Sequence, residues 1–272
     1  MTKVEYELMT SGEIAEARDQ TSVVFAPVSP IEWHGPHLPV GTDALHAHYV
    51  AVRVARAIGG VVLPALFAGT ETVLPRDLKK TLGLDEDARI VGMDYPGFAV
   101  KSLYFEESAF GVAVRELVRV LAANSFRLIV LVNGHGAPNH LQTLARIAHE
   151  ETLPEGPTVL SHMVSIPPPP PGDDSGHATR EETAVMMAIA GEHVRVDRLP
   201  GPDVPLRYAS YGIVDGPAFD GSPTSDRTVR PDADPRSATA EEGERILARE
   251  VERMVELVQR QLEALANTAR TR

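Results

Sequence analysis

Short apolar runs alternate with amphipathic stretches along most of the chain, and each pattern predicts one kind of element. Apolar runs of strand length lie at residues 21–28, 61–67, 127–132 and 158–164. Amphipathic stretches of helix length lie at residues 44–58, 106–124, 139–151 and 238–265. The repeated order of strand, loop and helix is typical of a layered α/β sheet with crossover helices. We therefore predict an α/β fold around a mostly parallel sheet.

Three regions follow neither pattern. From residue 68 to 101, charges, prolines and scattered glycines predict an irregular cover, which could be a lid or an oligomer contact. Between residues 194 and 236, frequent proline, glycine and aspartate predict a long structured excursion. The run Pro167 to Pro171 predicts a stiff loop beside the site, with a segment for a proline-recognising partner as the alternative.

The length and apolar content are enough for one large core. The chain has 272 residues, of which 43% are hydrophobic, so we predict a single domain over residues 1–272. We expect its last helix, about residues 238–265, to pack on that core or on a neighbouring subunit. Residues 1–20 lack the order of a signal peptide and no run has bilayer-spanning length, so we expect a cytoplasmic protein.

The charge and the cysteine count narrow the possible partners. The formal charge is −12, with 38 acidic and 26 basic residues, and no Lys/Arg cluster could follow a phosphate backbone. Nucleic acid and anionic membranes are therefore poor partners, and we expect a small-molecule substrate. The chain has no cysteine, so any metal must be held by His, Asp and Glu.

The residues best suited to chemistry follow the first apolar run. From Pro30 to Asp43 the chain reads Pro-Ile-Glu-Trp-His-Gly-Pro-His-Leu-Pro-Val-Gly-Thr-Asp. Side chains alternate in an extended segment, so Glu32 and His34 project to the same side, and glycine turns let Asp43 fold back towards them. Such oxygen and nitrogen ligands suit zinc, manganese or iron. Glu and His beside a turn are also common on a solvated surface, so spacing alone leaves both interpretations open.

Two further polar clusters follow the later runs. His135 stands between two glycines directly after the apolar run 127–132, which suits a histidine presented into a cleft, although Gly-His-Gly alone is a weak signal. The segment from His177 to Thr183 opens a helix. Ligands of parallel sheets bind beyond the carboxyl ends of the strands, where the clusters around His34 and His135 both lie.

Together the three clusters resemble the creatininase family. The signature Glu-x-His-Gly-Pro-His-Leu-Pro-x-x-Thr-Asp is matched from Glu32 to Asp43, and the Asn-Gly-His-Gly loop is matched from Asn133. The segment His-Ala-Gly-Glu-x-Glu-Thr-Ser is matched only in part, because Thr179, Arg180 and Ala184 replace Gly, Glu and Ser. The resemblance covers roughly residues 20–190. It implies a three-layer α/β/α sandwich and often a homohexamer, so we expect a homo-oligomer.

The resemblance also implies two divalent metal ions per subunit, which could be Zn, Mn or Fe. Glu32, Asp43 and His135 would hold one ion, while His34, Asp43 and Glu182 would hold the second, with Asp43 as the bridge. Creatininase itself places a glutamate two residues after the loop histidine, where this chain has an alanine. We therefore assign Glu182 to the second ion and count it among the catalytic residues.

The remaining predicted roles are proton transfer, stabilisation of an oxyanion and substrate binding. By resemblance, His177 would carry a proton to the leaving group, unless it is a structural histidine, and the Asn133 side chain or nearby N–H groups would hold an oxyanion. Three residues are placed on the substrate side: Trp33, His37 and Arg180.

Each of those three residues has an alternative role. Trp33, which replaces a glutamine common in the family, packs under the site or walls the pocket. His37 orients its neighbours. Arg180 binds an anionic substrate or forms an ion pair with Glu181 or Asp174.

We thus predict a dinuclear metal-dependent hydrolase that cleaves a C–N bond of a small cyclic or linear amide. Ring-opening of an oxidised cyclic polyol and deformylation of a pyrimidine nucleotide are the alternatives within the superfamily. A nucleotide would need a basic pocket, and the chain offers only scattered candidates such as Arg180, Arg207 and Arg227. A non-catalytic binding protein that retains the fold, and a metal-dependent isomerase or aldolase, are alternatives of other classes.

Overall fold

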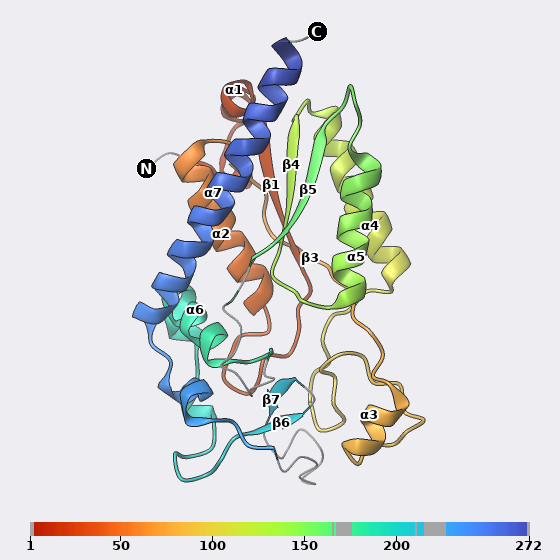
Figure 1. Ribbon diagram of the computed structural model, residues 1–272, viewed down its shortest axis with the longest axis vertical. Helices are drawn as coiled ribbons and strands as arrows, with labels where there is room; N and C mark the ends of the chain where they lie inside the picture. Colours follow the sequence, from red (N-terminus) through yellow and green to blue (C-terminus); the bar gives the residue numbers. More distant parts are fainter. Residues whose placement is uncertain (1–2, 165, 167–175, 210, 215–226, 271–272) are drawn as a thin grey trace.

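A parallel sheet lies at the centre of the molecule, with helices on both faces (Figure 1). The computed structural model describes residues 3–164, 166, 176–209, 211–214 and 227–270. The strands of the main sheet are β1 (Val23–Ser29), β2 (Val61–Val62), β3 (Leu66–Phe67), β4 (Leu128–Asn133) and β5 (Thr158–Met163). Their order is β2-β1-β4-β5, β3 also pairs with β1, and every one of these pairs is parallel.

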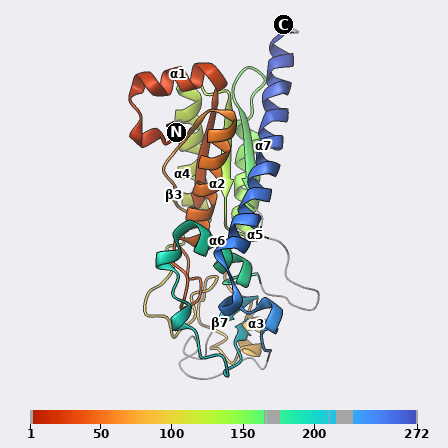
Figure 2. The same ribbon diagram turned by 90° about the vertical axis from the view of Figure 1, so that its left-hand side faces the viewer.

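The helices form two layers that enclose the sheet (Figure 2). One layer consists of α2 (Thr42–Ile58), α6 (Arg180–Ala190) and α7 (Ala240–Arg270). The other consists of α4 (Glu107–Ala123) and α5 (Pro138–Glu151), with α1 (Ser11–Thr21) packed against the same core cluster. The predicted α/β class and three-layer arrangement are therefore confirmed. No helix in the described part of the chain is both long and apolar enough to cross a membrane.

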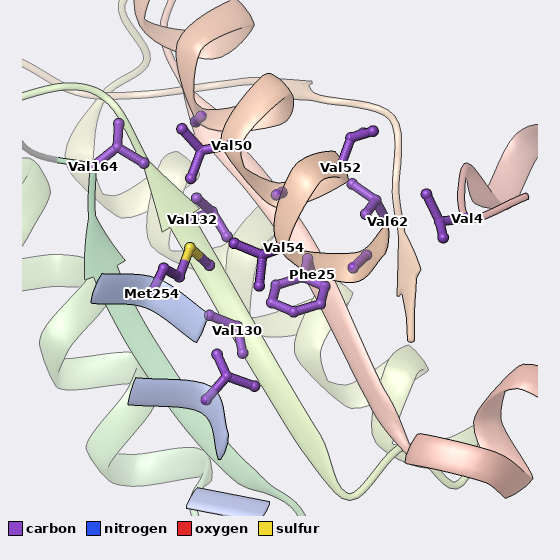
Figure 3. Close-up of a cluster of buried hydrophobic side chains, with 14 of the residues drawn as sticks. Val4, Phe25, Val50, Val52, Val54, Val62, Val130, Val132, Val164 and Met254 are labelled. Atoms are coloured by element: carbon purple, nitrogen blue, oxygen red, sulfur yellow. The ribbon is translucent and has the colours of Figure 1, made fainter. Parts of the chain in front are cut away.

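The two central strands, β1 and β4, are buried along their whole length because both faces of the sheet are covered there. Successive side chains of β1 alternate between the two core clusters, with Phe25 on the α2 and α7 side and Val24 on the α4 and α5 side. Figure 3 shows the first of these clusters, where Phe25 lies near Val130 of β4, Val54 of α2 and Met254 of α7.

The predicted strand at residues 61–67 is two short strands. β2 pairs with the start of β1 and β3 with its end, and Pro64 lies between them. Proline has no N–H to donate to a strand ladder, so pairing is interrupted there.

The two irregular regions both lie beyond the carboxyl ends of the strands (Figure 1). The first contains α3 (Arg76–Thr81), and the second contains the antiparallel hairpin of β6 (Arg207–Ala209) and β7 (Gly212–Val214). Single-turn 3₁₀ helices are η1 (Tyr6–Leu8), η2 (Gly191–His193), η3 (Val196–Arg198), η5 (Pro231–Ala233) and η6 (Pro235–Ser237). The proline run 167–171 is outside the residues that the structure describes.

Helix α7 packs tightly on α6 at Gly243. A Cβ atom at Gly243 would lie 1.9 Å from the backbone oxygen of Ala184. Gly243→Ala should therefore lower the stability by about 1–3 kcal/mol, or roughly 2–6 °C in Tm, measured by thermal denaturation. Gly191→Ala is the control, because Gly191 has φ −57° and ψ −29° and no atom within 4 Å of an added Cβ. Equal Tm values for both variants would contradict the close contact of the helices.

Candidate metal centre

Six titratable side chains converge beyond the carboxyl ends of β1 and β4, and all six are buried. The first ligand set is Glu32, Asp43 and His135, and the second ligand set is His34, His177 and Glu182. Within each set, one possible ligand atom from every residue lies within 4.8 Å of the others. The structure thus brings together all five residues that the sequence assigned to metal ions, and adds His177 to the second set.

In the first ligand set one nitrogen of His135 faces both carboxylates, and it makes a hydrogen bond with Asp43 only. His135 Nδ1 lies 2.8 Å from Glu32 Oε2 and 3.2 Å from Asp43 Oδ2. Glu32 Oε2 is buried and receives no hydrogen bond from the described residues. Two carboxylates and an imidazole that converge in this way fit a divalent cation.

In the second ligand set His34 is oriented by the backbone. His34 Nδ1 lies 3.0 Å from the carbonyl oxygen of Glu32, which can only accept, so this nitrogen donates and Nε2 is the nitrogen left for a ligand. His34 Nε2 lies 3.0 Å from Asp43 Oδ1. Asp43 therefore presents Oδ1 to the second set and Oδ2 to the first, which is the geometry of a bridging carboxylate.

His177 is held close to both ligand sets. Its Nε2 donates to the backbone oxygen of Trp33, and its Nδ1 lies 3.2 Å from Glu32 Oε1. The sequence analysis assigned His177 to proton transfer. Its grouping with His34 and Glu182 equally suits a metal ligand, so both roles are compared below.

Glu182 is positioned by the first turn of α6. Its side chain accepts a hydrogen bond from Thr179 N at 3.1 Å, and Thr179 Oγ1 accepts from Glu182 N at 3.1 Å, which is a capping box. A sequence motif that begins a helix therefore also fixes a candidate ligand.

Substitutions of Glu182 should separate its role in capping α6 from its role as a metal ligand. Glu182→Gln keeps an oxygen that can accept from Thr179 N, whereas Glu182→Ala removes it, so the alanine variant should be less stable than the glutamine variant by about 1 kcal/mol in the metal-free form. Both variants should bind less metal than wild type by elemental analysis. Equal metal content in all three proteins would contradict the assignment of Glu182 as a ligand.

Burial disfavours the charged form of every titratable group in this centre. At several groups, however, the charged neighbours together have a larger effect on the pKa than burial has. Burial alone would lower the pKa of His34, yet Asp43 and the neighbouring glutamates raise that pKa to about 10. Burial would raise the pKa of Asp43, yet His34 and His135 hold it well below its usual range. Burial and the nearby His34 lower the pKa of His177 to about 4, so this ring is neutral at pH 7.

Asn133 holds the loop that carries His135. Its Oδ1 accepts from His135 N at 2.9 Å, and its Nδ2 donates to His135 O at 2.7 Å. Because both ends of the amide are engaged with the loop, this arrangement favours a supporting role, and the oxyanion role stays a prediction.

Trp33, His37 and Arg180 were predicted on the substrate side. None of them is among the described residues that line the cavity over the two ligand sets. Trp33 stacks on Phe98 with ring centroids 4.0 Å apart, and its ring centroid lies 6.3 Å from that of His177. His37 Nε2 lies 2.9 Å from Thr183 Oγ1 in the first turns of α6. Their substrate-binding roles stay predictions, and these contacts favour support of the site.

Arg180 forms its ion pair with the last helix. Arg180 lies 2.7 Å from Glu242 of α7, whereas the expected partners were Glu181 and Asp174. Asp174 lies outside the described residues. The ion pair with Glu242 explains why a basic residue is compatible with this acidic region.

A cavity of about 500 Å³ opens over both ligand sets. Its described lining contains five carboxylates and no Lys or Arg: Glu32, Asp43, Glu71, Glu181 and Glu182. Sequence reasoning missed Glu71 and Tyr211, because both lie in the irregular regions. The one available signal for Glu71 was its position shortly after β3, a strand that ends at the same edge of the sheet.

Comparison with known protein sequences gives one consistent result. A sequence model of the creatininase family, described as creatinine amidohydrolase, matches residues 7–258. The mycofactocin precursor peptide peptidase of Mycolicibacterium smegmatis is 29% identical over 248 residues, which cover 88% of this chain and 85% of that protein. The creatinine amidohydrolase of Pseudomonas putida is 30% identical over 113 residues, which cover 42% of this chain and 37% of that protein.

Solved structures share the fold over almost the whole chain. A creatinine amidohydrolase (creatininase) structure has a TM-score of 0.67 at 21% identity and covers 96% of this chain and 99% of its own. A manganese form has the same TM-score, identity and coverage. A mutant creatininase of Zn-Zn type has a TM-score of 0.67 at 22% identity, with coverage of 96% and 99%.

Proposed function

This chain belongs to the creatininase family, whose members are hydrolases of amide bonds, and we propose that it is a dinuclear metal-dependent hydrolase that cleaves the C–N bond of a small cyclic or linear amide. The observation that carries the proposal is the position of Asp43. Its Oδ1 lies 3.0 Å from His34 Nε2 and its Oδ2 lies 3.2 Å from His135 Nδ1, so one carboxylate joins both ligand sets.

The donor set supports two divalent cations. The six side chains offer only oxygen and nitrogen, which Zn, Mn and Fe all accept. Three buried carboxylates lie close together, and Glu32 Oε2 has no hydrogen-bond donor among the described residues. Such an arrangement is costly without a cation. When bound, two divalent ions supply an activated water and polarise the amide carbonyl that the water attacks.

The composition of the cavity separates the candidate substrates. Its described lining has five carboxylates and no Lys or Arg, so the phosphate group of a nucleotide that lies beyond the metal ions would meet like charge. A neutral amide meets no such repulsion. A neutral oxidised polyol would not either, so ring-opening of such a substrate stays the alternative.

A peptide is the second candidate substrate. The relative that covers 88% of this chain is named as a peptidase of a precursor peptide. In addition, Glu71 and Thr72 line both the main cavity and an adjoining hollow of about 420 Å³. A substrate longer than a single ring could extend from one hollow into the other past these two residues.

The proposal is tested with metal-loaded protein and a panel of small lactams, N-formyl amides, short peptides and keto-polyols. Turnover in water labelled with ¹⁸O should place the label in the acid product. A product without the label would favour an isomerase or aldolase. Two bound metals with no turnover of any compound would favour the non-catalytic binding protein.

Substitution of His177 should decide between its two roles. As a proton carrier, His177→Asn should retain the metal content of wild type while kcat falls by about 10²–10⁴-fold. As a ligand of the second set, the same variant should lose one metal ion per chain. Elemental analysis alongside kcat distinguishes the two roles, and wild-type values of both would contradict each of them.

A further inference from the structure

A fourth buried carboxylate, Glu71, lies beside the first ligand set without belonging to it. Its side chain is only 4% exposed, although it sits on the irregular loop after β3. Oε1 accepts hydrogen bonds from Thr72 N at 2.5 Å and from Thr72 Oγ1 at 2.9 Å. The Glu71 Cγ atom packs so closely on Gly92 that a Cβ atom there would lie 2.4 Å away. The carboxylate is therefore held in place, with Oε2 towards His135.

His135 presents its two ring nitrogens to different groups. Nδ1 faces Glu32 and Asp43, whereas Nε2 lies 3.7 Å from Glu71 Oε2. Nε2 is buried and has no hydrogen-bond partner within the described chain. The separation of 3.7 Å is about 0.5 Å beyond the longest ordinary N–H···O hydrogen bond, of about 3.2 Å. A small rotation of either side chain closes this gap.

The other two histidines of the centre each donate a hydrogen bond from one ring nitrogen to a backbone oxygen, whereas His135 Nε2 has no such partner among the described residues. His34 directs its Nδ1 to the carbonyl oxygen of Glu32, and His177 directs its Nε2 to that of Trp33. Each ring is thus oriented by an acceptor behind it, which leaves the opposite nitrogen for a ligand. At His135 the group that stands behind Nε2 is the Glu71 carboxylate.

We infer that Glu71 is a positioning residue that keeps His135 in its metal-binding form. A carboxylate behind a ligating histidine fixes the tautomer and the orientation of the ring and makes the ligating nitrogen more basic. With the proton on Nε2 donated to Glu71, Nδ1 keeps its lone pair for the ion held with Glu32 and Asp43. The inference rests on the proposed function, and it concerns the first ligand set only.

Metal affinity tests this role without any need for a substrate. Metal-free protein is titrated with Zn²⁺ against a chromophoric chelator, which reports the affinity of each of the two sites. Glu71→Leu should weaken one site by about 10–100-fold and leave the other within about twofold. Glu71→Gln keeps an accepting oxygen and should lose less. Glu181→Gln removes another carboxylate from the same cavity and should leave both affinities unchanged.

A spectroscopic signal gives a second readout. In zinc-loaded protein labelled with ¹⁵N-histidine, the Nε2 proton of His135 should give a downfield resonance protected from exchange. This resonance should shift or broaden in Glu71→Gln and disappear in Glu71→Leu. If Glu71→Leu does not fold, Glu71→Gln and this resonance decide the question.

Three results would overturn the inference. Unchanged zinc affinity at both sites of Glu71→Leu would show that Glu71 does not act through His135. Equal weakening of both sites, with a lower Tm, would show a general structural role. An altered KM with unchanged zinc affinity would place Glu71 on the substrate. A wild-type protein that binds no zinc would instead refute the proposed function, so the two failures are distinguishable.

Discussion

Asp43→Ala should remove both metal ions at once. Asp43 places one carboxylate oxygen 3.0 Å from His34 and the other 3.2 Å from His135, so its loss takes a ligand from each position. Without the carboxylate, the remaining histidines also lose the negative charge that favours a cation. We expect close to two metal ions per chain in wild type and close to none in the variant, by elemental analysis after purification without chelator. Loss of a residue that only supports a metal ligand already lowers metal affinity or activity by about 10–100-fold. Loss of a ligand itself should therefore lower kcat/KM by at least about 100-fold.

The control for this prediction is an aspartate of similar size outside the site. Asp19 lies on α1 with an exposed side chain, 69% accessible, that pairs only with Arg18 among the described ion pairs. Asp19→Ala should retain wild-type metal content and activity. If Asp43→Ala kept one tightly bound ion, Asp43 would be a ligand of a single position and the bridged centre would be wrong.

The layered part of the fold could be predicted because burial on both faces leaves a strong trace in the sequence. The apolar run 127–132 became β4 with a shift of one residue, and the helix expected at 139–151 became α5 (Pro138–Glu151). The regions at 68–101 and 194–236 could not be predicted in the same way. Tyr95 and Met93 of the first region pack in one cluster with Ala209 of the second, and such a contact between distant loops produces no periodic pattern.

The candidate site also contains residues that could be predicted from the sequence and one that could not. Glu32, His34 and Asp43 lie within one short stretch, and His135 follows a clear strand, so local pattern and family resemblance were enough to propose them. Glu71 stands in no motif, and only the pairing of β3 with β1 brings it to the same edge of the sheet. Its contribution depends on tertiary structure and could not be read from neighbouring residues.

Gly134→Ala should damage the centre without changing a ligand. Gly134 packs directly on the backbone of Asp43, because an added Cβ would lie 2.2 Å from Asp43 O and 2.9 Å from Asp43 Cα. A flexible side chain could move aside, but the first turn of α2 cannot. The clash must therefore displace Asp43 or the loop that carries His135. A displacement of about 1 Å can cost about 100-fold in rate, so we expect that loss in kcat/KM, lower metal content and a destabilisation of about 1–3 kcal/mol.

Gly136→Ala is the matched control, because it changes the glycine on the other side of His135. There the nearest atom to an added Cβ is the mobile end of Met163, at 3.5 Å, which is an ordinary contact. Neither glycine has a positive φ, so the two variants differ mainly in the space available to the new methyl group. Metal content, kcat/KM and Tm should therefore stay near wild type in Gly136→Ala. Equal damage in both variants would mean that the loop needs flexible backbone instead of close contact with Asp43, and an intact centre in Gly134→Ala would show that this contact does not set the position of the bridging carboxylate.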